Sequence, residues 1–172
     1  AVDDLALAPD PDLALTALSR IADADAGARG LVEALDRDAA LRARVYAVLG
    51  TSVAFGDHLV RHPDDWQVLV VDDPSAEPAD GEDGSGPDRA AAQGRPRLRL
   101  ADATTVRREL LAAVGADPSS SDPTASSSDA VALDALRTAY RRRQLHIAGA
   151  DIADSEPFPE VAAALADLAD AT

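Results

Sequence analysis

Residues 129–151 repeat their apolar side chains at the spacing of an α-helix, and this segment constrains the fold more than any other. At about 100° of rotation per residue, the main apolar side chains fall within about 60° of one another. The side chains of this stripe are Leu133, Leu136, Tyr140 and Ile147. We therefore expect one long amphipathic helix that packs against other helices.

Three consecutive arginines, Arg141, Arg142 and Arg143, lie within this helix. On a helix Arg141 and Arg143 flank the apolar stripe, whereas Arg142 points away from it. Two interpretations stay open. The arginines form a solvated rim whose aliphatic stems cover apolar surface, or they contact an anion, a partner protein or a neighbouring domain.

The composition favours helices in the remainder of the chain as well. Hydrophobic residues make up 47% of the 172 residues but aromatic ones only 3%, so Leu, Val and Ala have to build the core. Alanine is the best helix former, and the residue types that favour strands are sparse. We expect an all-α fold, a bundle of about seven helices.

Apolar spacing predicts the helices, and capping residues predict where they begin. Gly27 and Gly30 mark an expected break, and Gly50 occupies the position of a capping glycine at a helix end. The expected N-caps are Asp10 or Asp12, Ser52, Asp64 and Asp65, and Thr104 or Thr105. The predicted helices are 11–26, 31–35, 41–49, 53–61, 66–70, 106–114, 129–151 and a last one with Phe158, Val161, Leu165 and Leu168 at helical spacing.

Two stretches are expected to lie outside the bundle as disordered insertions. From Asp72 to Gly94 the sequence is rich in Pro, Gly and acidic residues, and from Gly115 to Asp129 it is rich in Ser. Such segments bury too little surface to offset the entropy lost on ordering. One helical region over 1–172 is thus expected, with helices in 1–71, one helix in 95–114, and the basic and final helices in 130–172.

The formal charge of −15 argues against nucleic acid or an anionic membrane as partner, because both require a basic face. Cysteine is absent, which excludes disulfides and thiolate sites and suits a reducing compartment. No apolar run approaches the roughly 20 residues of a membrane span. We therefore expect a cytoplasmic protein. The lack of methionine, even at position 1, favours a fragment of a longer chain.

No motif builds a catalytic or metal site when its spacing is tested. His58 and His62 are four residues apart, as two metal ligands on one helix can be, but the glutamate of a zincin is leucine here. Polar contacts at the helix end are the expected role of both histidines. Ser52 lies in a partial nucleophile elbow, and helix capping explains it better. A calcium loop from Asp80 requires an acid where Ala91 stands.

Three segments also follow one another in an order known from one enzyme family. The first has Leu-Gly-x-Ser followed by Arg-His-Pro, the second is a basic helix with a short Ile-Ala and Asp ending, and the third contains Leu-x-x-Leu-Ala-Asp-Ala. They run from Leu49 to Trp66, from Leu136 to Ile152 and from Glu160 to Ala171. Together they resemble bifunctional glutamine synthetase adenylyltransferase/adenylyl-removing enzymes. The chain departs from that pattern at Ala150, where a basic residue is usual, and at Ala166, where a serine is usual.

The resemblance implies the helical stretch at the N-terminal side of the deadenylylating half. In that family a nucleotidyltransferase-type sheet follows, with Gly-Lys-Leu-Gly-Gly and Asp-x-Asp motifs that hold metal. The whole enzyme is then expected to use ATP and magnesium, to act on glutamine synthetase and to respond to a PII signalling protein.

This chain itself is expected to be non-catalytic and to bind no cofactor or metal. Its candidate site consists of Arg141, Arg142 and Arg143, which would dock a partner or a domain. The alternative is a stand-alone acidic helical module for protein interaction without enzymatic activity. The sequence beyond Thr172 separates the two hypotheses, because only the enzyme requires an Asp-x-Asp motif on a strand there.

Overall fold

The structure is a computed structural model that describes residues 2–24, 27–71, 97–120, 124–125 and 128–172. Within these ranges the chain forms eight α-helices, one 3-10 helix and one π-helical turn, and no strand. The all-α prediction is therefore confirmed. The predicted insertion from Asp72 to Gly94, including the calcium loop that was tested, lies outside the described residues. The described part of the Ser-rich segment before Asp129 contains no helix.

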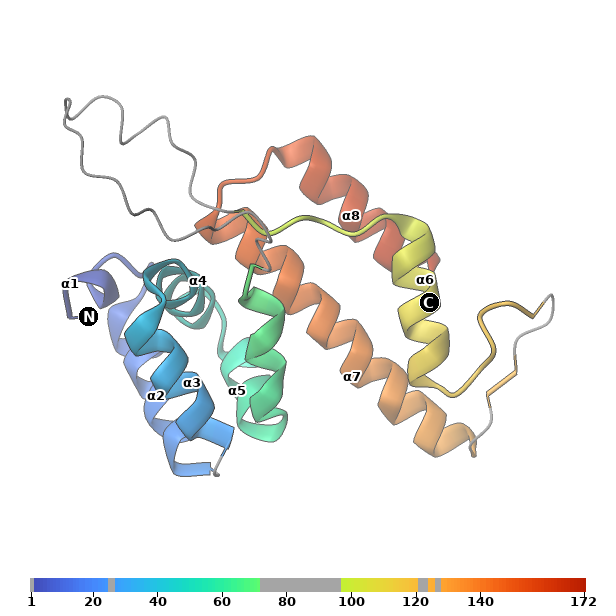
Figure 1. Ribbon diagram of the computed structural model, residues 1–172, viewed down its shortest axis with the longest axis horizontal. Coiled ribbons are helices and arrows are strands. Elements are labelled where there is room, and N and C mark those ends of the chain that lie inside the picture. The colour runs from blue at the N-terminus through green and yellow to red at the C-terminus, as the bar shows by residue number, and fades with distance from the viewer. Residues whose placement is uncertain (1, 25–26, 72–96, 121–123, 126–127) are drawn as a thin grey trace, which may run out of the picture.

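The helices follow one another along the chain in two groups (Figure 1). The first group is α1 (Val2–Leu5), α2 (Pro11–Ala24), α3 (Gly27–Arg37), α4 (Ala39–Leu49), α5 (Val53–Arg61) and the 3-10 helix η1 (Pro63–Leu69). The second group is α6 (Ala103–Ala113), α7 (Asp129–Ala148), the π-helical turn η2 (Gly149–Ala153) and α8 (Phe158–Asp170).

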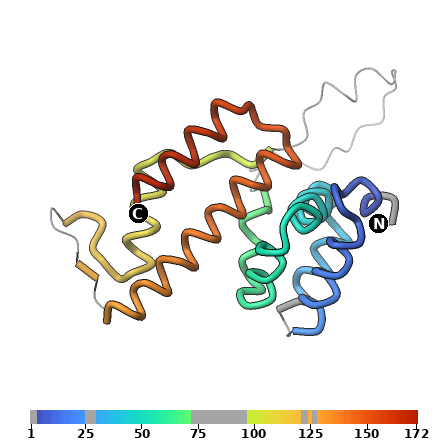
Figure 2. Tube along the Cα trace, turned by 180° about the vertical axis from the view of Figure 1, so that it is seen from behind, coloured from blue at the N-terminus to red at the C-terminus, as the bar shows by residue number. Residues whose placement is uncertain are grey.

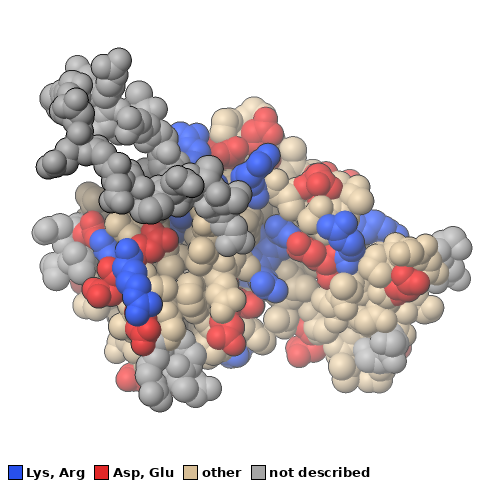
Figure 3. All heavy atoms as spheres, in the orientation of Figure 1, with Lys and Arg blue, Asp and Glu red and all other residues tan. Residues whose placement is uncertain are grey.

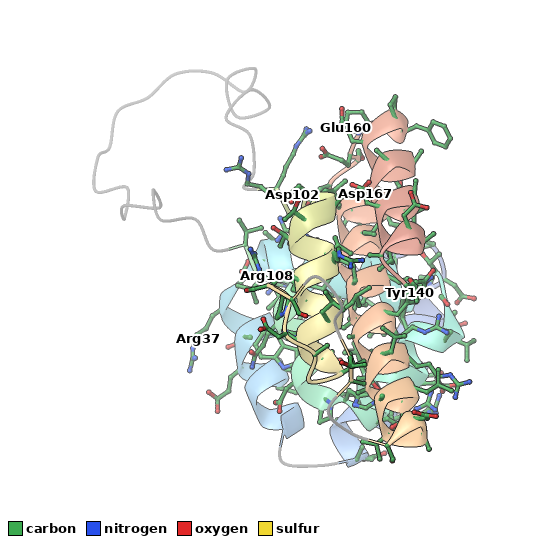
Figure 4. The ribbon with its side chains drawn as sticks, turned by 90° about the vertical axis from the view of Figure 1, so that its right-hand side faces the viewer. Arg37, Asp102, Arg108, Tyr140, Glu160 and Asp167 are labelled. Atoms are coloured by element: carbon green, nitrogen blue, oxygen red, sulfur yellow. The ribbon has the colours of Figure 1, made fainter. Side chains whose placement is uncertain are left out.

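Two lobes result, and α7 runs along their junction. Helices α1–α5 with η1 form an N-terminal lobe, and α6 and α8 pack against α7 in a C-terminal lobe (Figures 1 and 2). Seen from the side of the C-terminal lobe, α6, α7 and α8 lie next to one another, with Asp102 at the start of α6 (Figure 4). The C-terminal end of α7 continues into η2, which packs on α4.

Each lobe has its own apolar core. The two cores receive neighbouring side chains of α7, because Leu145 belongs to the first and Ile147 to the second. Two positions correspond to about 200° around a helix, so these side chains point in nearly opposite directions. The N-terminal core includes Ile21, Leu31, Leu41, Val45, Val48, Leu49, Leu59, Leu69 and Leu98. The C-terminal core contains Val106, Leu110, Ile147, Val161, Ala164 and Leu168.

Local capping signals set some of the helix starts. The Asp10 carboxylate accepts a hydrogen bond from the Leu13 N–H at 2.9 Å, which confirms it as the cap of α2. Ser52 occupies the N-cap position of α5, but its side chain makes no capping hydrogen bond. The cap of α6 is Asp102 rather than a threonine, since Asp102 Oδ1 accepts from the Thr105 N–H at 2.9 Å.

The negative charge of the Asp102 carboxylate favours its role as the cap of α6. The backbone and side-chain hydrogen bonds from Thr105 hold the pKa of the Asp102 carboxyl below its ordinary value. A carboxyl with a lowered pKa in the folded state contributes stability at neutral pH, and that contribution is lost as the pH falls through the lowered value.

Several sequence expectations are wrong in detail. The expected break lies just before Gly27, because α2 ends at Ala24 and α3 begins at Gly27, but Gly30 lies within α3. Asp65 caps no helix, because its carboxylate contacts His58 instead. Among the apolar positions assigned to helix stripes, Leu133 is 46% exposed and Phe158 is 81% exposed. Periodicity alone therefore overestimates their burial.

Candidate functional site

The three arginines of α7 have three different environments. Arg143 is 12% exposed and pairs with Glu109 of α6. Arg142 is 54% exposed and lies 3.5 Å from the carboxylate of Asp65 in η1. Arg141 is exposed, forms no ion pair within the described part of the chain, and lines a groove between α5 and α7. Two of the three arginines therefore brace α7 against its neighbours, and one remains available.

This α5–α7 groove has a volume of about 540 Å³. Its basic side chains come from the end of α5, from His62 directly after it and from the middle of α7, and its apolar ones come from α7 alone. The lining residues are His58, Arg61, His62, Leu133, Asp134, Leu136, Arg137, Thr138, Tyr140, Arg141 and Thr172. On the face shown in Figure 3, basic side chains lie over both lobes and in the middle between them, with acidic side chains among them.

The charge of the α5–α7 groove is opposite to that of the whole chain. Arg61, Arg137 and Arg141 line it, and among the described residues Asp134 is its only acidic side chain. None of the three arginines pairs with a carboxylate of a described residue. Arg61 uses its Nε to donate to the backbone oxygen of Asp57 at 3.0 Å, which leaves the outer nitrogens of its guanidinium for other acceptors. The groove thus holds guanidinium groups that can donate hydrogen bonds to an oxyanion.

The histidines next to the groove are structural. His58 is 4% exposed, and its Nε2 lies 2.8 Å from Asp65 Oδ2. The ring of His62 lies 4.9 Å from that of His58, between ring centres. Asp65 also contacts Arg142, so one carboxylate links α5, η1 and α7. Residues 2–24, 27–71, 97–120, 124–125 and 128–172 contain no group of three or more His, Cys, Asp or Glu that could hold a metal.

A second groove lies on another side of α7, against α6 and η1. Its volume is about 780 Å³, and its charged side chains include Asp65, Glu109, Arg142 and Arg143. These four residues pair with one another across the groove. His146 adds two contacts there, from Nδ1 to the Val68 oxygen at 2.8 Å and from Nε2 to the Arg99 oxygen at 3.0 Å. Because its charges are already compensated, this groove is a weaker candidate for an anion.

A buried ion pair fixes the far end of α7. Arg44 is 2% exposed, and its Nε donates to both oxygens of Asp154 at 3.0 Å. Asp154 Oδ2 also accepts from the Leu98 N–H at 2.8 Å. The pair therefore joins α4, the segment before α6 and the turn after η2. Ala150, where the sequence departs from the pattern of the family that it resembles, is fully buried.

The sequence pointed to Arg141 but missed Arg61 and Arg137. The spacing of Arg137 and Arg141 by four residues is a signal that they share a helix face. No local signal brings Arg61 to them, because the approach of α5 to α7 depends on the packing of the whole N-terminal lobe. The described residues also contain no helix long and apolar enough to cross a membrane.

Comparisons with known proteins give one consistent group of relatives. No protein-family model and no solved structure matches the chain. Relatives from Mycobacterium avium, Streptomyces avermitilis and Mycobacterium tuberculosis are 38%, 36% and 34% identical to it over 97%, 99% and 97% of the chain. Each carries the name bifunctional glutamine synthetase adenylyltransferase/adenylyl-removing enzyme. The chain spans 14% of the length of these relatives.

Proposed function

We propose that this chain is a non-catalytic helical part of a bifunctional glutamine synthetase adenylyltransferase/adenylyl-removing enzyme. The reason is that the chain is homologous to one region of such enzymes. The resemblance carried by the three sequence segments is confirmed by relatives 33–38% identical to the chain. The observation that carries the proposal is the extent of this match, which covers 97% or more of the chain.

The whole enzyme is proposed to act on glutamine synthetase in both directions. By the family resemblance, it transfers AMP from ATP to glutamine synthetase and removes it by phosphorolysis, with magnesium, in the cytoplasm. A PII signalling protein regulates it in this proposal. Phosphoryl transfer of this kind depends on metal-held carboxylates that position the reacting oxygens. The magnesium and ATP sites are assigned to the nucleotidyltransferase part of the enzyme, outside this helical region.

The contacts of the charged residues support a scaffolding role. The buried or braced groups, Arg44 with Asp154, His58 with Asp65, and Arg143 with Glu109, hold helices of the chain together. Within this scaffold α7 presents Arg141 to the α5–α7 groove, whereas Arg142 and Arg143 fix the helix in place. We assign to this face of α7 the docking of a partner or of another part of the enzyme.

The purified chain should release no ADP when it is incubated with adenylylated glutamine synthetase, phosphate and magnesium. The reason is that phosphorolysis requires metal-bound carboxylates, which the proposal assigns to another part of the enzyme. Release is followed with a coupled assay for ADP. The full-length enzyme that contains this chain serves as the positive control and should show both adenylylation and deadenylylation.

Two outcomes contradict the proposal in different ways. ADP release by the purified chain contradicts its non-catalytic role. An intact full-length protein that neither adenylylates nor deadenylylates glutamine synthetase contradicts the assignment to this enzyme.

A further inference from the structure

We propose that the α5–α7 groove binds an acidic polypeptide segment. Arg61, Arg137 and Arg141 contact carboxylates of this segment, and the apolar floor formed by α7 accepts one of its aliphatic side chains. The inference deepens the docking role proposed above, and rests on it, by stating the chemistry of what docks.

The first argument is the pairing of arginines elsewhere in the chain. The sequence has 31 acidic residues and 16 basic ones, all of the latter arginine. Arg20, Arg37, Arg42, Arg44, Arg142 and Arg143 each pair with a carboxylate. Among the residues that the structure describes, the three arginines of the groove form no such pair, and neither do Arg97, Arg99, Arg107 and Arg108. The groove differs from these other unpaired arginines because it combines three guanidinium groups from two helices with an apolar surface.

The second argument is the geometry of the arginines on α7. Arg137 and Arg141 are four residues apart, which places their Cβ atoms about 5–6 Å from one another on one face. Like charges at this spacing repel each other, and a bound carboxylate between them relieves the repulsion. Arg61 faces the same groove from the end of α5. Oxyanions seated in the groove would therefore bridge the two helices.

The third argument is the apolar floor. Leu133 precedes Arg137 by one helical turn and is 46% exposed, and Leu136 and Tyr140 line the groove beside it. A bare inorganic anion would leave this surface in water. A peptide with alternating carboxylates and aliphatic side chains covers both the guanidinium groups and the apolar floor, and guanidinium forks match the geometry of carboxylates.

The total charge limits the size of the partner. With a net charge of −15, the chain repels a long polyanion such as nucleic acid or an anionic membrane, and only a short acidic segment gains from the local positive field of the groove. Binding should weaken as salt is added, because exposed charges are screened beyond about 10 Å at 0.1 M salt.

The test uses the full 172-residue chain and two labelled synthetic peptides. In one peptide Glu alternates with Leu and Gly, and in the other each Glu is Gln. Fluorescence anisotropy at low salt should show binding of the acidic peptide only. Arg137→Gln together with Arg141→Gln should weaken this binding at least about tenfold, since two charge contacts are lost.

The matched control is Arg107→Gln together with Arg108→Gln on α6. Both of these arginines are exposed and form no ion pair with a described residue, so the change in net charge is the same as in the groove variant. The control should retain the affinity of the unchanged chain. Leu133→Ser should weaken binding of the Leu-containing peptide. The same substitution should leave the affinity for a peptide with Ala in place of Leu unchanged.

Three results would overturn the inference. The acidic peptide does not bind, the groove variant and the α6 control bind it equally, or inorganic phosphate binds at the groove while the peptide does not. The last result would identify a small-anion site. If the full-length enzyme modifies glutamine synthetase normally while the peptide does not bind, only this inference fails. If the peptide binds and the full-length protein lacks both activities, only the proposed function fails.

Discussion

Gly50 shows at the scale of one residue how a position can be predicted for the wrong reason. The sequence suggested a capping glycine after α4, and such glycines usually adopt the left-handed conformation. The helix does end there, but Gly50 has a φ of −76°, which any residue adopts. The requirement for glycine comes from close approach instead. A Cβ at this position would lie 2.9 Å from the backbone oxygen of Asp10 and 3.1 Å from the Ala8 Cβ.

Gly50→Ala should therefore destabilise the fold by about 1–3 kcal/mol, the usual cost of overpacking a site that cannot expand. The backbone of the segment between α1 and α2 would have to move. The free energy of unfolding is measured by urea denaturation followed by circular dichroism.

Gly30→Ala is the matched control within α3. The nearest atom to a Cβ there is the Trp66 Cζ2 at 3.9 Å, an ordinary contact. Because alanine is the better helix former, this substitution should stabilise the protein by about 0.5–1 kcal/mol. Equal effects of the two substitutions would contradict the close-approach explanation.

At the scale of one element, α4 depends on a cap that the sequence analysis missed. Asp38 Oδ1 accepts from the Ala40 N–H at 2.8 Å and from the Leu41 N–H at 3.0 Å. Asp38→Ala should cost about 1 kcal/mol of stability, as is typical for the loss of an N-cap side chain. Ser52→Ala at the start of α5 should cost less, because the Ser52 side chain makes no capping hydrogen bond. Denaturant midpoints of the two variants and the unchanged protein provide the comparison.

Sequence reasoning succeeds for an element when its limits are local. Helix α5 begins and ends at the predicted residues, and its end is set by Pro63, which follows it closely. It fails where burial depends on distant neighbours. The first half of α7 is covered only in part, so Leu133 is exposed, whereas Leu145, which the predicted stripe omitted, is fully buried. A single stripe cannot describe a helix that two lobes cover from different sides.

The candidate site follows the same rule. Arg141 could be singled out because three arginines in a row are unusual in an acidic chain. The pairing of Arg142 and Arg143 with Asp65 and Glu109 could not be predicted, since it requires η1 and α6 to pack on α7. For the same reason Arg61 was missed, because it lies far from Arg141 in the sequence.

At the scale of the whole molecule, Asp154 links α4 with the segment before α6. Asp154→Ala should cost about 3–5 kcal/mol, because it removes the carboxylate from Arg44, which is 2% exposed. The Leu98 N–H loses an acceptor as well. Urea unfolding, followed by circular dichroism and by the fluorescence of Trp66, measures the loss.

The control for Asp154 is Glu33→Ala, which removes an exposed pair with Arg37. Both of its side chains are more than half exposed, at 63% and 76%, so the change should amount to a few tenths of a kcal/mol. A small effect of Asp154→Ala, comparable to that of the control, would show that the buried pair does not hold the two lobes together.

The π-helical turn after α7 shows where the length of this chain can vary. A π-type turn holds an additional residue relative to an α-helical one. Deleting one residue from Gly149–Ala153 would leave an α-helical turn in its place, so Asp154 would still point toward Arg44. Deleting a residue from α7 itself would instead rotate everything that follows by about 100°, and α8 would present another face to its core. Single-residue deletions are therefore expected in this turn or between α6 and α7, and not within α7.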